Sequence, residues 1–237
     1  MKENLNNKII SLKNVSFSNV LKNINFEIKT GEIIAIMGNS GSGKTTLLNL
    51  LSGFIIADQG ELTVLNQNLK KMKNNKLDTF RRENITYIFQ DYKLVNYLNV
   101  KENISLIQKL NHQKIDKEKF NSLVNELGLD KLINKPVTQL SGGQKQRVAI
   151  GRSLIGLQPL VFADEPTGAL DLPNRNLVMN ELVTNAQRYQ KTLIVVTHDF
   201  EVALKAQKII FIKNHQIDAI WKTNEVNQSQ VRKKLEE

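Results

Sequence analysis

The chain has 237 residues, enough for one large α/β domain or two small ones, and its apolar (41%) and charged (24%) fractions are ordinary for a globular protein. It contains no cysteine, which excludes disulfide bonds and thiolate metal sites, and it carries a formal charge of +10. No run approaches the roughly 20 apolar residues that span a bilayer, and residues 1–8 lack the apolar core of a secretory signal, so we expect a cytoplasmic location.

The first elements along the chain are strands that lead to a glycine-rich turn. Ile9–Val15 alternates like a strand, and Ile24–Ile28 is predicted to be its partner. Ile33–Met37 is apolar throughout, as expected for a strand buried on both faces of a parallel sheet. After the turn, Thr45–Leu51 begins a helix that Gly53 ends.

A hydrophilic stretch separates the next two strands, which are predicted at Glu61–Leu65 and Ile85–Phe89. It contains Lys70–Lys76, the densest run of positive charge. Such charge serves in some proteins to bind nucleic acid, an anionic membrane or a nucleotide. Since the run has no interleaved aromatic residues on which bases would stack, we favour a solvated surface rich in Lys and Asn and expect no nucleic-acid partner.

The middle of the chain changes to helical patterns. Helices are predicted at Val100–Leu110 and Asp116–Leu127, and Gly128 is suited to end the second. Ser141 is well placed to cap a further helix. The layout is therefore an α/β core interrupted by a helical insert at about 91–156.

Strand patterns return after the insert. The polar tail that follows Trp221 is expected to fray. Asn214 and His215 could turn a terminal hairpin, and neither His215 nor His112 has a context that indicates more than a surface role. The predicted elements are strands at Leu160–Ala163, Thr192–Val196, Lys208–Lys213 and Gln216–Ile220, and a helix from about Asn174 to Tyr189.

The glycine-rich turn matches the pattern G-x-x-x-x-G-K-[ST] of phosphate-binding loops. Glycines let the backbone curl so that successive N–H groups point at phosphate oxygens, and the next helix directs its N-terminus at the same anion. Lys44 would place its charge on the β- and γ-phosphates of ATP, and the Thr45 hydroxyl would ligate Mg²⁺. The expected ATP-binding residues are Gly38, Asn39, Ser40, Gly41, Ser42, Gly43, Lys44, Thr45 and Thr46.

Two acidic residues follow the apolar strand Leu160–Ala163. Asp164 is expected to hold Mg²⁺ through a water molecule, and Glu165 to polarise the water that attacks the γ-phosphate. A base positioned in this way contributes about 10²–10⁴-fold to a rate. Two solvated acids at a strand end are the alternative, but the phosphate-binding pattern upstream favours catalysis.

The segment Leu140–Gln144 has no role in a generic phosphate-binding enzyme, and it resembles the signature motif of ABC-type ATPases. The other motifs of that family follow the same order. Gln90 resembles the Q-loop glutamine, Gly168–Asp171 the D-loop and His198 the switch histidine. The resemblance extends from about residue 9 to residue 220.

This resemblance implies an α/β fold in which a RecA-like P-loop NTPase core carries an antiparallel β subdomain and the helical insert, as one ABC ATPase domain over residues 1–237. It also implies that two copies pair about a two-fold axis, so that each ATP is held between one phosphate-binding loop and the partner's signature residues. ATP would close this dimer, and hydrolysis to ADP would open it. The signature residues are Ser141, Gly142, Gly143 and Gln144.

The resemblance assigns further roles at the site. His198 would contact the γ-phosphate and hold the catalytic geometry with Glu165. Gln90 would touch Mg²⁺, together with Thr45 and Asp164, and relay motion into the helical insert. Asp171 would be the acidic residue of the D-loop.

The sequence evidence for a residue that contacts the adenine base is weaker than the evidence for the phosphate-binding residues. The family places an aromatic ring against adenine in the turn after the first strand, and that turn is short here, with Asn19 near the usual position. Phe17 is the nearest aromatic candidate, although a core role for it fits equally well.

Residues 80–90, 35–38 and 163–168 resemble the corresponding segments of LolD/MacB-type ATPases, which work with separate or fused membrane subunits. This implies a separate transmembrane permease as partner and a position at the inner face of the cell membrane. Residues 91–98 are apolar and aromatic for a loop. They either pack under the insert or form a groove for a helix of the permease, and we favour the groove.

Other members of the same family fit less well. A chromosome-maintenance ATPase would carry a long coiled coil between Lys44 and Ser141, and no heptad pattern is sustained there. A translation factor would carry two cassettes, and one type of importer ATPase would carry a C-terminal regulatory domain. A soluble ATPase of iron–sulfur assembly is the remaining alternative.

Overall fold

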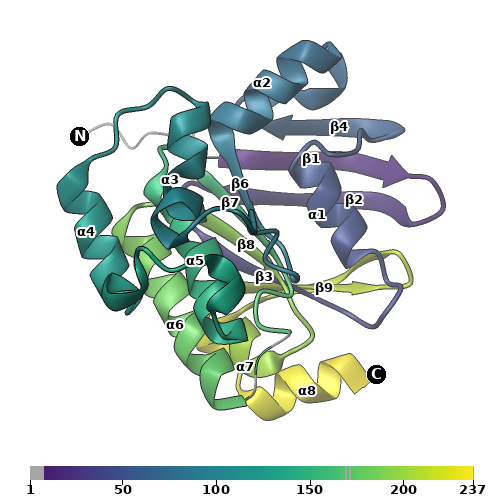
Figure 1. Ribbon diagram of the computed structural model, residues 1–237. Coiled ribbons are helices and arrows are strands. Elements are labelled where there is room, and N and C mark those ends of the chain that lie inside the picture. The colour runs from purple at the N-terminus through teal and green to yellow at the C-terminus, as the bar shows by residue number, and fades with distance from the viewer. Residues whose placement is uncertain (1–7, 169, 171, 237) are drawn as a thin grey trace, which may run out of the picture.

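The computed structural model describes residues 8–168, 170 and 172–236 of the chain (Figure 1). The strands are β1 (Lys8–Phe17), β2 (Leu21–Lys29), β3 (Ile33–Met37), β4 (Gln59–Val64), β5 (Gln67–Asn68), β6 (Ile85–Ile88), β7 (Leu160–Asp164), β8 (Thr192–Val196), β9 (Lys208–Lys213) and β10 (Gln216–Lys222). The helices are α1 (Lys44–Leu51), α2 (Asn74–Asn84), α3 (Val100–Leu110), α4 (Lys117–Glu126), α5 (Gly142–Ile155), α6 (Leu172–Arg188), α7 (Phe200–Ala203) and α8 (Gln228–Glu236). Short 3₁₀ turns lie at Leu69–Lys71, Asp130–Leu132, Val137–Gln139 and Thr223–Glu225.

A six-stranded sheet forms the centre of the molecule, with the strand order β10-β9-β3-β8-β7-β6. Strand β10 is antiparallel to β9, and the other neighbours are parallel. Both faces of this sheet are covered. Ile33 and Ala35 of β3 face the helical layer, whereas Ile34 and Ile36 face the second sheet. Side chains of a strand alternate between its faces, which explains why β3 is apolar throughout.

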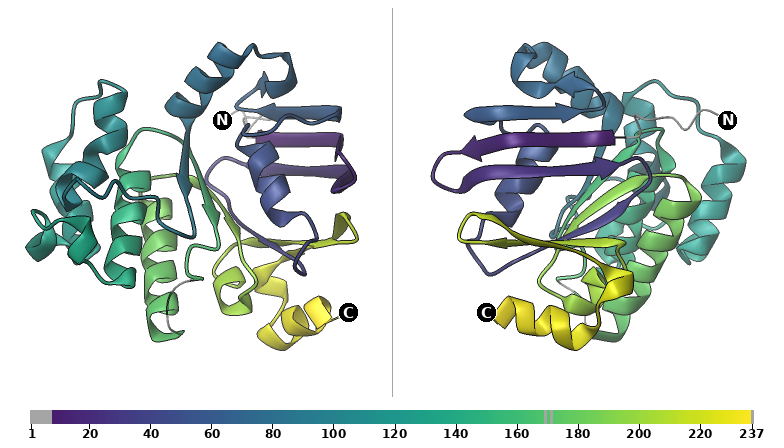
Figure 2. Two further views of the ribbon diagram at one scale, coloured as in Figure 1. Left: turned by 45° about the vertical axis from the view of Figure 1, so that its right-hand side comes forward. Right: turned by 180° about the vertical axis from the view of Figure 1, so that it is seen from behind.

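The second sheet is antiparallel, with the order β2-β1-β4-β5. Helix α1 lies between the two sheets (Figure 2). Its four leucines, at positions 47, 48, 50 and 51, are fully buried in the core that the sheets share. Burying a leucine is worth about 1.5–3 kcal/mol, so this contact fixes the helix that follows the glycine-rich turn.

Between β6 and β7 the regular elements are all helical. Helix α5 packs against α3, α4 and α6 and against strand β6, and α3 and α4 form the outer part of this layer (Figure 2). The expected caps are present. Ser141 begins α5 with a capping box to Gln144, and Gly128 adopts the left-handed conformation (φ 61°) after α4.

The predicted α/β class is confirmed, but three helices, α2, α7 and α8, were not predicted. Helix α2 occupies part of the hydrophilic stretch between the predicted strands, and it buries Leu77 and Phe80 in the core that the two sheets share. The expectation that the tail frays is also wrong, because α8 forms there. Val231 is fully buried, and Lys234 contacts the Asp218 carboxylate at 2.5 Å. Val231 is the one buried residue that α8 shows, and a single buried side chain produces no periodic apolar pattern in the sequence.

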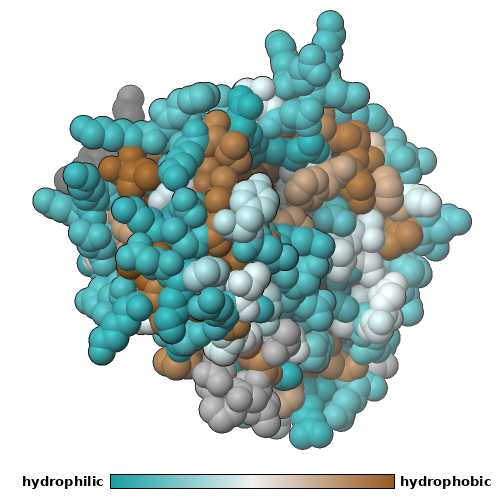
Figure 3. Space-filling model, in the orientation of Figure 1, coloured by the Kyte–Doolittle hydropathy of each residue, from teal (hydrophilic) through white to brown (hydrophobic). Residues whose placement is uncertain are grey.

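The face of the molecule shown in Figure 3 is mostly hydrophilic, and its apolar residues lie in separate patches. Of the large apolar side chains that are exposed, Tyr97 stands out with 89% of its surface accessible. Among the residues that the structure describes, we find no helix long and apolar enough to cross a membrane.

Candidate functional site

Four of the predicted site segments directly follow the carboxyl ends of four neighbouring parallel strands. The glycine-rich turn follows β3, His198 follows β8, Glu165 follows β7 and Gln90 follows β6. Ligands of open α/β sheets bind at this edge. The order of the sheet therefore brings together residues that are far apart in the sequence.

The glycine-rich turn is shaped by two close approaches of the backbone. Gly43 has a φ of 105°, and a Cβ added there would lie 2.8 Å from the Val20 carbonyl oxygen. A Cβ at Gly38 would lie 2.3 Å from the Ile212 carbonyl oxygen. Real side chains do not tolerate such distances, so glycine is required at both ends of the turn.

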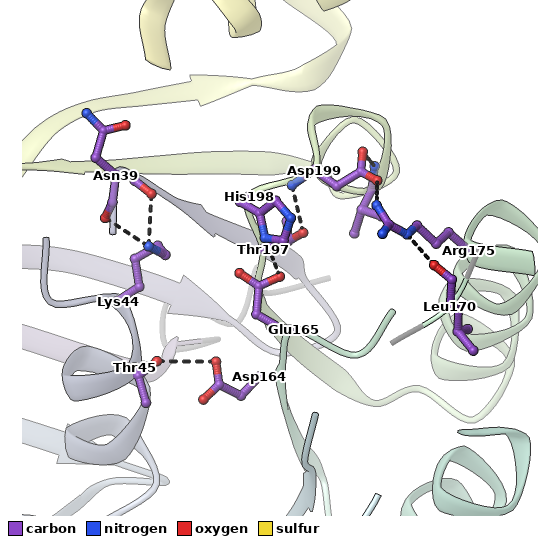
Figure 4. A network of polar contacts seen from close by, with 12 residues as sticks. Asn39, Lys44, Thr45, Asp164, Glu165, Leu170, Arg175, Thr197, His198 and Asp199 are labelled. Carbon is purple, nitrogen blue, oxygen red and sulfur yellow. Dashed lines mark hydrogen bonds and ion pairs between the residues drawn. The ribbon is translucent and has the colours of Figure 1, made fainter. Parts of the chain in front are cut away.

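Lys44 folds back over the turn. Its Nζ donates hydrogen bonds to the carbonyl oxygens of Gly38 at 2.9 Å and Asn39 at 3.0 Å (Figure 4). Burial lowers the pKa of Lys44, and the negative charges of Glu165 and Asp164 oppose this shift. The ammonium group is thus held at the mouth of the turn, where a phosphate would meet it.

Ser42 indicates that the turn is built for a polar ligand. Its side chain is buried, and its Oγ has no hydrogen-bond partner among the residues described here. A buried hydroxyl without a partner is costly, and a phosphate oxygen would satisfy it. Thr45 and Thr46 lie in the first turn of α1, where the helix dipole also favours an anion.

Two of the three predicted metal ligands are in contact. The Thr45 hydroxyl lies 3.3 Å from a carboxylate oxygen of Asp164. Burial raises the pKa of Asp164, while the hydrogen bond from Thr45 lowers it. Gln90, the third predicted ligand, contacts the segment after Glu165, because a Cβ added to Gly168 would be 3.2 Å from its Nε2. Among the described residues, no group of three or more His, Cys, Asp or Glu could hold a metal ion by itself.

Glu165 and His198 form a direct pair. His198 Nδ1 lies 2.9 Å from a carboxylate oxygen of Glu165 (Figure 4). Glu165 has a left-handed backbone, with a φ of 46°, and its N–H donates to the Val196 carbonyl oxygen at 3.0 Å. Non-glycine residues rarely adopt this conformation, and such strain is concentrated at functional sites.

Lys44, Glu165 and His198 line one cavity of about 510 Å³, whereas the metal-side residues Thr45, Asp164 and Gln90 are not part of its lining. One of its walls was not expected from the sequence. Arg232 and Leu235, on helix α8, line the same cavity. The tail that seemed unstructured therefore borders the site.

The signature residues do not line this cavity. Ser141, Gly142, Gly143 and Gln144 lie at the start of α5 in the helical layer, and Ser141 and Gln144 satisfy each other's backbone N–H groups at 3.4 and 3.0 Å. The Tyr92 hydroxyl is the neighbour of Gly142, since a Cβ there would lie 3.3 Å from it. Within one chain, the signature and the glycine-rich turn are separate.

The adenine contact stays a prediction. Phe17 is half-buried and packs against the core of the antiparallel sheet. His215, expected to be a surface residue, is half-buried instead. Its Nδ1 lies 3.0 Å from the Val20 carbonyl oxygen, beside a second cavity of about 250 Å³ next to the glycine-rich turn. Asp171 lies outside the described residues.

Sequence reasoning missed Arg175. Its Nε donates to the Leu170 carbonyl oxygen at 2.7 Å, and its guanidinium lies 3.7 Å from the Asp199 carboxylate (Figure 4). It thereby joins the segment after Glu165 to the residue that follows His198. A single arginine on a helix has no sequence pattern that could reveal this contact.

Comparison with known proteins gives a consistent result. A family described as "ABC transporter" matches residues 21–168. Bacitracin export ATP-binding protein BceA of Halalkalibacterium halodurans is 40% identical over 201 residues, which are 84% of this chain and 79% of that protein. Macrolide export ATP-binding/permease protein MacB of Campylobacter jejuni is 38% identical over 207 residues, which are 86% of this chain and 32% of that protein.

The fold agrees with a solved structure described as the dimeric structure of MJ0796, a bacterial ABC transporter cassette. The TM-score is 0.80 at 34% identity, and the match covers 90% of this chain and 98% of that one. The chain spans about half the length of the relatives from Mycoplasma that it also matches.

Proposed function

Because the chain belongs to the ABC transporter family, in its LolD/MacB-type branch, we propose that it binds and hydrolyses MgATP to drive a separate membrane protein. The observation that carries this proposal is the convergence of Lys44, Glu165 and His198 on one cavity beside the glycine-rich turn. The names of the relatives, which include export proteins, favour this role over that of a soluble assembly ATPase.

The turn binds the phosphates of ATP. Its N–H groups and the start of α1 supply donors, Lys44 supplies a positive charge, and Ser42 gains the partner that it lacks. Mg²⁺ fits the adjacent oxygens of Thr45 and Asp164, and Gln90 would complete the set of ligands from its position against Gly168. When bound, the ion neutralises negative charge on the β- and γ-phosphates.

Glu165 acts as the base. Its carboxylate accepts a proton from the water that attacks the γ-phosphate, and the strained backbone of the residue holds the carboxylate at the cavity. His198, 2.9 Å away, orients that carboxylate and contacts the γ-phosphate. The half-buried Asp164 remains the metal-side acid because it faces Thr45 rather than His198.

Two copies of the chain form the complete site. The signature at the start of α5 has a capped helix N-terminus that suits an anion, but within one chain it does not reach the cavity that contains Lys44. A two-fold dimer brings the signature of each copy to the ATP of the other. We treat residues 1–237 as one ABC ATPase domain with a helical subdomain at about 91–156.

The permease binds at the helical side of the molecule. Tyr97 is almost fully exposed, whereas its neighbour Leu94 packs into the core. An exposed aromatic on an ordered loop is a typical anchor for a partner. The chain is therefore cytoplasmic and peripheral, at the inner face of the cell membrane.

Glu165→Gln tests this proposal. The variant keeps an oxygen for His198 but cannot accept the proton, so turnover should fall by about 10²-fold or more while ATP still binds. The expected result is a dimer in ATP, measured by size-exclusion chromatography with light scattering. Glu225→Gln, which changes an exposed glutamate paired with Lys222, is the control and should match wild type. A Glu165→Gln protein that stays monomeric in ATP would contradict the two-copy site, and unchanged turnover would contradict the role of Glu165.

A further inference from the structure

The turn that follows Gln90 has an unusual backbone. Tyr92 and Lys93 are consecutive and both left-handed, with φ values of 64° and 44°. Neither residue is glycine, so each position is disfavoured unless its surroundings hold it. The Tyr92 N–H donates to the Phe89 carbonyl oxygen at 3.0 Å, which closes the turn around Gln90.

Arg152 holds this turn from the signature helix α5. Its Nη1 donates to the Lys93 carbonyl oxygen at 2.7 Å, and its Nη2 donates to the Tyr92 carbonyl oxygen at 2.8 Å. The two hydrogen bonds of one planar guanidinium fix both position and orientation of the strained peptide pair. Only 7% of the Arg152 surface is exposed, so its guanidinium is largely shielded from water.

The surroundings of Arg152 suggest more than packing. None of the ion pairs found among the described residues includes Arg152, although a buried charge without a counter-ion is expensive. Its position in the last turn of α5 offsets part of this cost through the helix dipole. The remaining compensation comes from the two carbonyl oxygens of the turn.

The same turn also touches the other end of α5. The Tyr92 hydroxyl lies beside Gly142, where a Cβ would be 3.3 Å from it. The turn therefore contacts the signature helix near its C-terminus through Arg152 and at its N-terminus through Tyr92. On its other side, Gln90 lies against Gly168, three residues beyond the base Glu165.

We propose that Arg152 is a positioning residue that clamps the turn after Gln90 to α5, so that Gln90 and the signature motif move as one unit. A change at the γ-phosphate of one site is then passed to the signature that serves the other ATP. Arg152 sets the coupling between the two ATP sites rather than the affinity of either one. This inference rests on the proposed two-copy function.

Arg152→Gln in the Glu165→Gln background tests the clamp. Glutamine is shorter than arginine, lacks the planar fork of the guanidinium and carries no charge, so it cannot reproduce the two charge-assisted hydrogen bonds. The ATP concentration that gives half-maximal dimer should rise about tenfold, within the range typical of coupling between sites. Affinity for ADP, measured by calorimetry, should stay within about twofold, because ADP reports on the glycine-rich turn alone. In the otherwise wild-type chain, Arg152→Gln should also bring the Hill coefficient of ATPase activity to about 1.

Arg147→Gln is the matched control. Arg147 lies on the same helix and is partly buried, but it pairs with Glu181 at 3.0 Å instead of with the turn. The Arg147→Gln variant should leave the dimer midpoint, the ATP concentration that gives half-maximal dimer, unchanged. Arg152→Lys, which retains a charged donor, should shift that midpoint by about threefold, and it carries the test if Arg152→Gln does not fold.

The outcomes separate the two claims. If Glu165→Gln alone forms no dimer in ATP, the two-copy function fails and the clamp falls with it. If that parent dimerises and neither Arg152 variant shifts the midpoint, the clamp is refuted while the function stands. A parallel loss of ADP affinity and dimerisation would also refute the clamp, because it would show a general structural role.

Discussion

Raising the pH from 8 to 10.5 is expected to stabilise the fold through one buried lysine. Lys191 precedes β8 and has 4% of its surface exposed. Its Nζ donates to the carbonyl oxygens of Gly156 at 2.7 Å and Gln158 at 2.6 Å, in the loop that leads into β7 and Asp164. Burial, assisted by the charge of Lys119, lowers the pKa of Lys191 from 10.5 to about 8.

The sign and size of the effect follow from linkage. Below pH 8 the lysine is protonated in both states, and folding carries the full cost of burying its charge. Between the two pKa values the unfolded chain binds more protons than the folded one, so the free energy of unfolding rises with pH. The pKa of Lys191 is about 8 in the folded chain and 10.5 in the unfolded chain. At 1.36 kcal/mol per pKa unit, this difference raises the free energy of unfolding by about 3 kcal/mol.

Urea unfolding at a series of pH values measures this effect, because urea adds no charge that would screen the site. Other groups also titrate in this range, so the informative quantity is the difference between wild type and Lys191→Met. Methionine fills the same space and does not titrate, and its free energy of unfolding should rise by about 3 kcal/mol less than that of wild type across the window. Lys117→Met, at an exposed position, should follow the wild-type profile. Parallel profiles for Lys191→Met and wild type would refute the reasoning.

Two further predictions concern the glycine-rich turn. Lys44→Ala should weaken ATP binding by about tenfold or more, because a charge-assisted contact is lost; unchanged affinity in calorimetry would remove Lys44 from its assigned role. Gly43→Ala should abolish nucleotide binding, because its Cβ would lie 2.8 Å from the Val20 carbonyl oxygen. Gly41 also has a positive φ, but a Cβ added there would meet no atom within 4 Å. Gly41→Ala should therefore retain nucleotide binding with a smaller loss of affinity. Equal losses in the two alanine variants would show that conformational strain, and not the close approach, decides the turn.

A further prediction concerns the membrane permease that we propose as the partner of this chain. BceA and MacB carry "export" in their names, and the exposed Tyr97 offers a place to test for a permease contact. Cargo would be selected by that partner, since the cavity that holds Lys44 and Glu165 is built for phosphate.

Several elements could be predicted because their causes are local. Ile33–Met37, Val100–Leu110 and Thr192–Val196 were predicted to the residue, since a fully buried strand is apolar throughout and an amphipathic helix has a clear period. The Ser141 cap follows from its own side chain and Gln144, three residues later. The phosphate-binding motif likewise depends on neighbouring residues alone.

Other features depend on contacts between distant segments. Helix α8 is stabilised by the burial of Val231 and by the ion pair between Lys234 and Asp218. The sequence of the polar tail predicts neither contact. Arg152 and Arg175 bind backbone carbonyls, which every residue carries, so no residue type in the sequence identifies their partners.

The sequence by itself determined that the chain is a P-loop ATPase, because the chemistry of phosphate binding and hydrolysis needs particular residue types at Gly38–Thr45, Asp164 and Glu165. Only the tertiary structure decided how those residues are held. The parallel sheet aligns their strand ends at one edge, and Arg152 joins the turn after Gln90 to the signature helix. A motif can be identified from neighbouring residues because its chemistry is local. The positions of the motifs relative to one another depend on strand order and on hydrogen bonds between residues that are distant in the sequence.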